Sequence, residues 1–131
     1  MDWGEKRFGV ALSDPLRMFA QPLTTLTRRA GKRAPVGPIA ELIAKHEVIE
    51  VVVGLPLTPE GDEGEAAADA RALGEAIGKR AGVPVHFIDE RMTTAQALRA
   101  ARHVGVKDHE GRDRIDQMAA VAILQAWLDR R

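Results

Sequence analysis

Hydrophobic residues near the start of the chain recur at every second position, which is the spacing of a half-buried β-strand. Phe8, Val10 and Leu12 set this period, so we predict a strand over Phe8–Ser13. A second strand is predicted over Pro22–Leu26, the stretch PLTTL. Its proline lacks a backbone N–H and therefore suits only the start of a strand or a sheet edge. The short turn between the two segments predicts that they pair antiparallel.

The middle of the chain contains two further predicted strands with a more continuously apolar pattern. Val51–Val53 are consecutive β-branched residues, which is typical of a parallel strand covered on both faces. The stretch VPVHFIDE predicts the next strand, with Val83, Val85 and Phe87 on one side. The intervening stretch GLPLTPEGDEG is rich in glycine and proline, so we expect a loop there that begins with a turn at Gly54.

Helices are predicted where apolar residues recur every three or four positions. The first follows the breakers in GKRAPVGP, and its apolar face comprises Ile39, Leu42, Ile43 and His46. The second is predicted to end at Gly82, and its stripe comprises Ala66, Ala70, Leu73, Ile77 and Ala81. Thr93 and Gln96 resemble a capping box that opens a third helix, which extends to about His103. The last helix is predicted from about Arg112 to Asp129.

The predicted order of elements is strand, strand, helix, strand, helix, strand, helix, helix. Strand–helix–strand units form parallel crossovers, whereas the first two strands pair antiparallel. The length of 131 residues fits one domain. We therefore predict a single α/β domain over residues 1–131, in which helices pack on a mixed sheet.

Composition excludes several classes of protein. The chain has no cysteine, which excludes a disulfide framework and a thiolate metal site and suits a reducing compartment. No apolar run approaches the ~20 residues that a membrane-spanning helix requires. No basic segment followed by an apolar one marks a signal peptide at the start. We therefore expect a cytoplasmic protein without membrane contact.

The formal net charge is zero, but the charges are segregated along the chain. Basic residues gather in TRRAGKR and again between Arg99 and Arg114, whereas acidic residues gather between Glu60 and Glu75. This segregation is compatible with one basic face that binds nucleic acid. It is also compatible with ordinary solvated loops and helix faces, the interpretation that charge alone favours. Zero net charge predicts modest nonspecific affinity for nucleic acid.

Two acidic residues stand in unusual places. Glu90 follows a predicted buried strand, and ligands collect at the carboxyl ends of strands in open α/β sheets. The alternative is a polar strand exit or a surface ion pair between Glu90 and Arg91. Asp116 falls within the apolar arc of the last helix, where a carboxylate needs a cation or a metal as partner. The apolar arc comprises Ile115, Met118, Ala119, Ala122, Ile123 and Ala126.

Two more acids are candidates for the same site. Asp113 lies one turn before Asp116, although a favourable acid in the first helical turn is the simpler explanation. Asp2 precedes Gly4, which allows a turn or a close backbone approach; the alternative is a frayed terminal acid. If Asp2 ends a strand, then Asp2, Glu90 and Asp116 form an all-oxygen site for Mg²⁺ or Mn²⁺. Two such ions about 4 Å apart can activate water and stabilise the leaving oxygen of a phosphodiester.

Four segments, in order and at characteristic spacing, resemble the YqgF (RuvX) family of bacterial proteins with a ribonuclease-H-like fold. These segments are DWGEKRFGVALSD, VVVGLPLTPEGDEG, FIDERMTT and RIDQMAAVAILQAWL. The resemblance covers nearly the whole chain, from about Asp2 to Leu128. Members are described as Holliday-junction resolvases and as nucleases that mature the small-subunit ribosomal RNA precursor.

The resemblance implies an antiparallel meander of three strands followed by two parallel strands. It implies that Asp2, Glu90 and Asp116 are the catalytic carboxylates and hold Mg²⁺ or Mn²⁺, with two ions expected. It also implies phosphate-binding residues, which are Lys6, Arg7, Arg91 and Thr94. For the threonine, capping of a helix together with Thr93 is the alternative. Gly54, Leu55 and Pro56 match a family loop that follows a strand, and Asp113 lies outside the family pattern.

The chain departs from the family pattern before Asp2. Members of the family carry an apolar run there, which forms the central first strand, whereas only Met1 precedes Asp2 here. We therefore expect a truncated first strand and the loss of paired backbone groups and buried apolar area. We also expect Asp2 to be poorly ordered or its metal affinity to be weakened.

The leading hypothesis is a divalent-metal-dependent nuclease, a hydrolase of phosphodiester bonds that processes the 5′ end of the small-subunit rRNA precursor in ribosome biogenesis. The first alternative is a Holliday-junction resolvase of DNA recombination and repair, which is expected to dimerise on a two-fold junction. The second is a nucleic-acid-binding module weakened in catalysis by the missing strand. Sugar-kinase and actin-like ATPases also open with Asp-x-Gly, but a single domain of this length lacks the second lobe that clamps a nucleotide.

Overall fold

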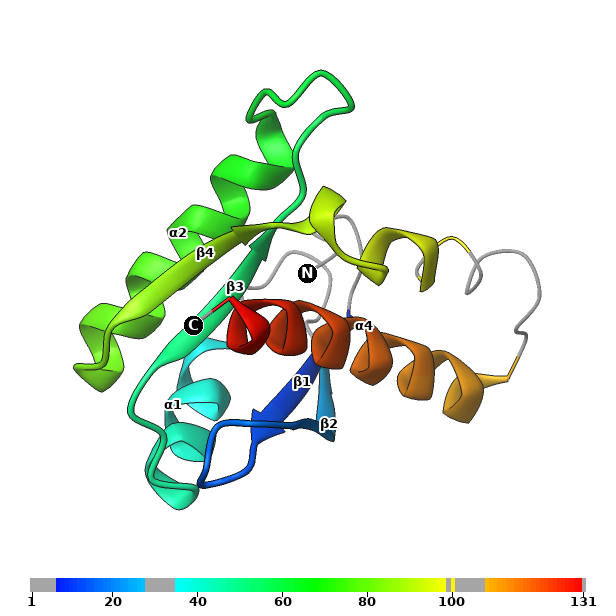
Figure 1. Ribbon diagram of the computed structural model, residues 1–131. Helices are drawn as coiled ribbons and strands as arrows, with labels where there is room; N and C mark the ends of the chain where they lie inside the picture. Colours follow the sequence, from blue (N-terminus) through cyan, green and yellow to red (C-terminus); the bar gives the residue numbers. More distant parts are fainter. Residues whose placement is uncertain (1–6, 28–34, 99, 101–107, 131) are drawn as a thin grey trace.

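The computed structural model describes residues 7–27, 35–98, 100 and 108–130 (Figure 1). Strand β1 (Arg7–Ser13) pairs antiparallel with β2 (Ala20–Thr27), as predicted. Pro22 lies opposite Ala11, directly after the register shift between Val10 and Ala11. Proline cannot donate to a regular ladder, so its place beside this irregularity explains how the strand tolerates it.

The second pair of strands is parallel. Strand β3 (Val51–Leu55) and strand β4 (Val85–Asp89) run in register from Val51 opposite Val85 to Leu55 opposite Asp89. Helix α2 (Glu65–Ala81) forms the crossover between them and packs on both strands, and helix α1 (Val36–Lys45) packs beside α2 (Figure 1). The predicted parallel crossover is therefore confirmed.

Helix α2 ends where the sequence predicts. Gly82 adopts the left-handed conformation with φ of 71°, and its N–H donates to the carbonyl of Gly78 at 2.8 Å. Glycine takes this conformation without a steric penalty, which explains the sharp stop. The predicted stripe is shifted in the first turn, because Ala67 is fully buried whereas Ala66 is only half-buried.

Helix α4 (His109–Asp129) is the longest described element and lies across β1 and β2 (Figure 1). It begins before the predicted residue 112, because the Asp108 side chain caps it by accepting a hydrogen bond from the N–H of Gly111. Most of its predicted arc is buried or half-buried, but Met118 is 42% exposed and does not belong to the core. No described helix is long and apolar enough to cross a membrane.

Between β4 and α4 the chain forms a single 3₁₀ turn, η1 (Glu90–Met92), and then a short helical stretch at residues 95–98 and 100. The Thr93 hydroxyl accepts from the N–H of Ala95, which confirms a helix start at this threonine. The reciprocal half of the predicted capping box is replaced, because the N–H of Thr93 donates to the carbonyl of Glu90. Residues 101–107, including the predicted end at His103, lie outside the described residues.

The buried apolar side chains form three clusters. The first joins β4 and α4, the second joins α1 and α2, and the third joins β3 and α2. Their buried members are Ile88, Ala95, Ala119 and Ile123; Ile43, Leu73 and Ile77; and Val53, Leu55 and Ala70.

The sheet differs from the prediction of one mixed sheet. The described strands form two separate two-stranded sheets, β1–β2 and β3–β4. None of the described strands pairs with both β1 and β3, so no described strand joins the two pairs into one sheet. The α/β class, with antiparallel and parallel pairs flanked by helices, is confirmed. The expected truncated first strand falls on residues 1–6, outside the described residues.

Candidate active site

Glu90 occupies the carboxyl end of the parallel pair and is completely buried, with an exposed fraction of 0%. Local hydrogen bonds turn the chain here. The carboxylate of Asp89 accepts the N–H of Arg91 at 2.9 Å, and the carbonyl of Glu90 accepts the Thr93 hydroxyl at 2.8 Å. Because the backbone is fixed on both sides of Glu90, its side chain is held inside the molecule rather than at the surface.

Gly54 makes the space that the Glu90 side chain fills. A Cβ atom on Gly54 would lie 2.5 Å from Oε1 and 2.7 Å from Cγ of Glu90, and 2.8 Å from Cδ1 of Ile123. The carboxylate therefore lies directly on the backbone of β3 and close to helix α4. The predicted turn at Gly54 is wrong, because β3 continues through Leu55 and the loop begins at Pro56.

Asp116 approaches from the other side, in the first half of helix α4, and is 6% exposed. Its backbone lies against β1, since a Cβ atom on Gly9 would be 1.8 Å from the carbonyl oxygen of Asp116. Only glycine permits so close a contact between a strand and a helix. This contact fixes the distance between the backbone of Asp116 and strand β1.

The structure thus buries both predicted carboxylates that lie within the described residues. Asp116 and Gly54 border one cavity of about 550 Å³, and Glu90 packs on Gly54. Asp2, the third predicted carboxylate, lies outside the described residues. Within the described ranges, histidine and acidic side chains form no group of three or more that is arranged to hold a metal ion.

Arg91 is placed by Asp89 and not by Glu90. Its guanidinium forms a bidentate contact with the Asp89 carboxylate, with Nη2 2.7 Å from Oδ2, and Nη1 donates to the carbonyl of Pro59 at 3.2 Å. Arg91 therefore forms its ion pair with Asp89, and not the surface pair with Glu90 that was one alternative. The hydrogen bond from the Arg91 side chain holds the pKa of Asp89 below its ordinary value. This arrangement ties the loop after β3 to the end of β4.

Of the other predicted phosphate-binding residues, Arg7 and Thr94 lie within the described part of the chain, and their surroundings differ. Arg7, at the start of β1, forms an ion pair with Asp113 at 3.2 Å, in which both side chains are partly buried. Thr94 is exposed beside Thr93, and Lys6 lies outside the described residues. Because Arg7 has Asp113 as a partner, its guanidinium is positioned by helix α4.

Asp113 does more than place a favourable acid in the first turn of a helix, which was the simpler explanation of its position. Besides its contact with Arg7, its backbone carbonyl accepts a hydrogen bond from the Thr25 hydroxyl at 3.1 Å. Its position one turn before Asp116 gave a hint, but the partner at Arg7 is 106 residues away in the sequence. No local pattern reveals a contact over that separation.

Comparisons of the sequence with known proteins identify its family. The sequence model of the family described as "RuvX: Holliday junction resolvase" matches residues 1–130. A protein of Mycobacterium sp. (strain KMS) is 46% identical over 132 residues, which cover 100% of this chain and 78% of that protein. A protein of Mycobacterium tuberculosis (strain ATCC 25177 / H37Ra) is 47% identical over 133 residues, which cover 100% of this chain and 77% of its own length.

A third relative, from Mycobacteroides abscessus, is 44% identical over 132 residues and is covered to 80% of its length. All three relatives carry the name "Putative pre-16S rRNA nuclease". The family match extends over nearly the entire chain and includes both buried carboxylates. This chain belongs to the RuvX family.

Proposed function

We propose that this protein is a divalent-metal-dependent nuclease that hydrolyses phosphodiester bonds, and that its natural substrate is the 5′ end of the small-subunit rRNA precursor. The observation that carries the proposal is the burial of two carboxylates, Glu90 at 0% and Asp116 at 6% exposure, in a chain of the RuvX family. Carboxylates are seldom buried without a charged partner or a metal. The name shared by the relatives supports precursor rRNA as the substrate.

The fold supports the same proposal. An antiparallel pair followed by a parallel pair with one helical crossover is consistent with a ribonuclease-H-like domain that comprises residues 1–131. Glu90 belongs to the end of the parallel pair and Asp116 to the helix that covers the antiparallel pair. The proposed site therefore lies where the two halves of the molecule meet.

The donor set fits a hard cation. Glu90 and Asp116 supply only oxygen atoms, which suit Mg²⁺ or Mn²⁺, and the chain has no cysteine to favour a softer metal. Glu90 and Asp116, with Asp2 as the proposed third ligand, would hold the metal. Bound divalent ions supply an activated water and charge stabilisation for the leaving oxygen.

The remaining residues would position the nucleic acid. The Arg91 guanidinium is held by Asp89, the neighbour of the buried acid in the sequence, and Thr94, an exposed residue, lies on the same segment. Arg7, oriented by Asp113, and Lys6 complete the proposed phosphate-binding set. Contacts of this kind position a backbone and do not read its sequence.

The central experiment measures cleavage by the Glu90→Gln variant. Glutamine keeps the size of the side chain but removes its charge, so we expect cleavage of an rRNA precursor fragment in Mg²⁺ or Mn²⁺ to fall by at least about 100-fold. EDTA should abolish cleavage by the unaltered protein. The matched control is Glu110→Gln, an exposed acid in the first turn of α4, which should cleave normally. A folded Glu90→Gln variant with full activity would exclude the assigned role.

A second candidate substrate is a four-way DNA junction, which the family's description favours. The two substrates are compared side by side in the same buffer, together with the mass of the protein in solution. Preference for the junction and a stable dimer would indicate a resolvase, whereas preference for the RNA would indicate a role in ribosome biogenesis in the cytoplasm. Metal-independent binding without cleavage of either would indicate a nucleic-acid-binding module.

A further inference from the structure

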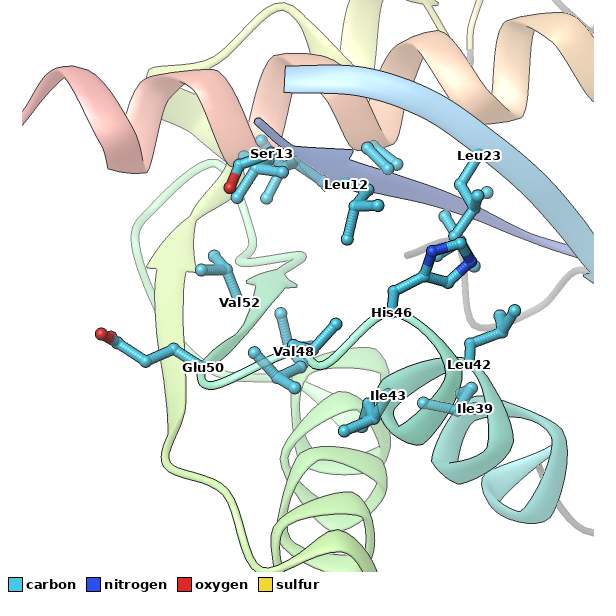
Figure 2. Close-up of a pocket in the computed structure, with 18 of the residues that line it drawn as sticks. Leu12, Ser13, Leu23, Ile39, Leu42, Ile43, His46, Val48, Glu50 and Val52 are labelled. Atoms are coloured by element: carbon cyan, nitrogen blue, oxygen red, sulfur yellow. The ribbon is translucent and has the colours of Figure 1, made fainter. Parts of the chain in front are cut away.

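The cavity of about 550 Å³ and the end of strand β4 offer different chemistry to a nucleic acid. Figure 2 shows aliphatic side chains around the cavity, among them Leu12, Leu23 and Val52. Aliphatic groups cannot replace the water that surrounds a phosphate, so this wall does not suit a nucleic-acid backbone. The end of β4 instead presents the guanidinium of Arg91, whose side chain is 36% exposed.

A tight turn in the loop after β3 brings a carbonyl group to Arg91. The N–H of Gly61 donates to the carbonyl of Thr58 at 2.8 Å, and Pro59 occupies the second position of this turn, which proline favours. The N–H of Thr58 donates to the carbonyl of Asp62 at 3.0 Å, and the Thr58 hydroxyl accepts the N–H of Asp62 at 3.1 Å. These bonds hold the turn in one shape, in which the Pro59 carbonyl accepts Nη1 of Arg91 at 3.2 Å.

Three residues surround the guanidinium, and we call them the guanidinium seat: Asp89, Pro59 and Gly61. The Asp89 carboxylate accepts Nε at 3.1 Å and Nη2 at 2.7 Å. Gly61 has a φ of 91°, which glycine adopts without a steric penalty. A Cβ atom on Gly61 would lie 3.3 Å from both Nη1 and Nη2 of Arg91, so its backbone lies directly against the guanidinium.

The seat leaves part of the guanidinium open. Arginine carries five N–H donors. Asp89 accepts the donor on Nε and one on Nη2, and Pro59 accepts one on Nη1. One donor on each terminal nitrogen therefore has no partner among the described residues. Two such donors can bind two oxygens of one phosphate, a geometry that the ammonium group of lysine does not reproduce.

We propose that Asp89 is a positioning residue, which fixes the Arg91 guanidinium so that its two remaining donors meet a backbone phosphate in one orientation. A side chain that is ordered before the nucleic acid arrives loses little entropy on binding. The inference rests on the proposed function, in which Arg91 contacts phosphate, and it adds a role for Asp89 and the rest of the seat.

The charge and the position of Asp89 predict opposite effects on binding. Its negative charge lies beside the guanidinium and repels a phosphate. If only charge mattered, removal of this charge would tighten the binding of a nucleic acid. If Asp89 positions Arg91, the same removal weakens binding, although a repulsive charge is also lost. The direction of the change in Kd therefore separates the two roles.

The test substitutions are Asp89→Asn, Arg91→Gln and the two combined. Asparagine keeps one oxygen to accept the backbone N–H of Arg91, but it cannot hold the guanidinium with two oxygens. The probe is a fluorescein-labelled rRNA precursor fragment, titrated in EDTA while anisotropy is recorded. We expect Kd to rise at least about fivefold in Asp89→Asn and about tenfold in Arg91→Gln. In the Arg91→Gln background, Asp89→Asn should change Kd less than about twofold.

A matched control and a kinetic readout separate positioning from a structural role. Asp62→Asn removes an exposed acid from the neighbouring loop and should leave Kd unchanged within about twofold. In cleavage assays with Mg²⁺, Asp89→Asn should raise KM and leave kcat within about twofold, a split that loss of folded protein does not produce. Should Asp89→Asn fail to fold, Gly61→Ala crowds the same guanidinium without changing any charge and should also raise Kd.

Other results would overturn the proposal. An unchanged or lower Kd in Asp89→Asn would show that Asp89 acts at most as a charge. An equal effect of Asp89→Asn with and without Arg91 would show that it does not act through this arginine. Failure of the proposed function gives a different pattern, because the unaltered protein would then neither bind nor cleave the RNA fragment or the DNA junction, and the role of Asp89 would fall with it.

Discussion

The two sheets are attached to their helices by different kinds of contact. The parallel pair β3–β4 packs on α2 through apolar side chains, whereas β1–β2 is joined to α4 by directional polar contacts. Gln125 accepts the N–H of Ala20 and donates to the carbonyl of Met18, both at 2.9 Å. The Thr25 hydroxyl donates to the carbonyl of Asp113 at 3.1 Å.

This difference bears on the proposed site because each half contributes one carboxylate. Glu90 comes from the half that is packed by apolar contacts, and Asp116 comes from the half that is fixed by polar contacts. Hydrogen bonds and a backbone contact set the position of α4 along β1 more narrowly than apolar packing can. The placement of Asp116 should therefore depend on few residues, and each should be sensitive to substitution.

The largest effect is expected from Gly9→Ala. The new Cβ would lie 1.8 Å from the carbonyl oxygen of Asp116, and neither backbone can move without shifting α4 on β1. We expect the free energy of unfolding to fall by about 3 kcal/mol or more, measured by chemical denaturation. Cleavage should be lost as well, because Asp116 moves.

The matched control is Gly37→Ala in helix α1, where a Cβ would meet nothing within 4 Å. Its free energy of unfolding should change by less than about 1 kcal/mol, since alanine has the higher helix propensity. Equal stability of Gly9→Ala and Gly37→Ala would show that the contact between β1 and α4 is not restrictive.

A smaller effect is expected from Gly74→Ala in the apolar half. The new Cβ would lie 2.6 Å from Cζ of Phe87, the far end of a side chain that has some freedom to move. The gain in helix propensity offsets part of the crowding, so we expect a loss of about 1–2 kcal/mol in the free energy of unfolding. Cleavage at low temperature should persist in Gly74→Ala and not in Gly9→Ala; loss of cleavage in both would contradict the contrast between the two halves.

The smallest effect is a pH dependence at the end of β4. Since the hydrogen bond from Arg91 holds the pKa of Asp89 below its ordinary value of 3.8, this carboxylate stabilises the folded protein above that pH. The contribution is lost as the pH falls through the lower pKa of the folded state. Asp89→Asn should therefore lower Tm at pH 6, and the difference from the unaltered protein should shrink toward pH 2.5.

Asp62→Asn, in the exposed loop after β3, is the control for that measurement and should leave Tm unchanged at pH 6. A difference between Asp89→Asn and the unaltered protein that stays constant from pH 6 to pH 2.5 would show that the ion pair does not contribute through ionisation.

Local patterns predicted most of the elements for clear reasons. The period-two pattern of β1, the β-branched run of β3 and the apolar stripe of α2 each reflect a face that must be buried. Gly82 ended α2 as predicted because its left-handed conformation is a local property. Less was predictable at Gly54, where glycine serves the Glu90 side chain from a distant strand end and not a turn.

The sequence by itself determined the α/β class and the family, because hydrophobic periodicity and motif spacing are local properties of the chain. It also identified Glu90 and Asp116, the two candidate acids within the described residues that proved to be buried, from a strand end and from the apolar arc around Asp116. Only the tertiary structure decided the partners of charged and polar groups. Arg7 pairs with Asp113, Arg91 with Asp89, and Gln125 holds the turn after β1. These choices depend on which surfaces meet when the helices dock, and side chains far apart in the sequence acquire neighbours only then.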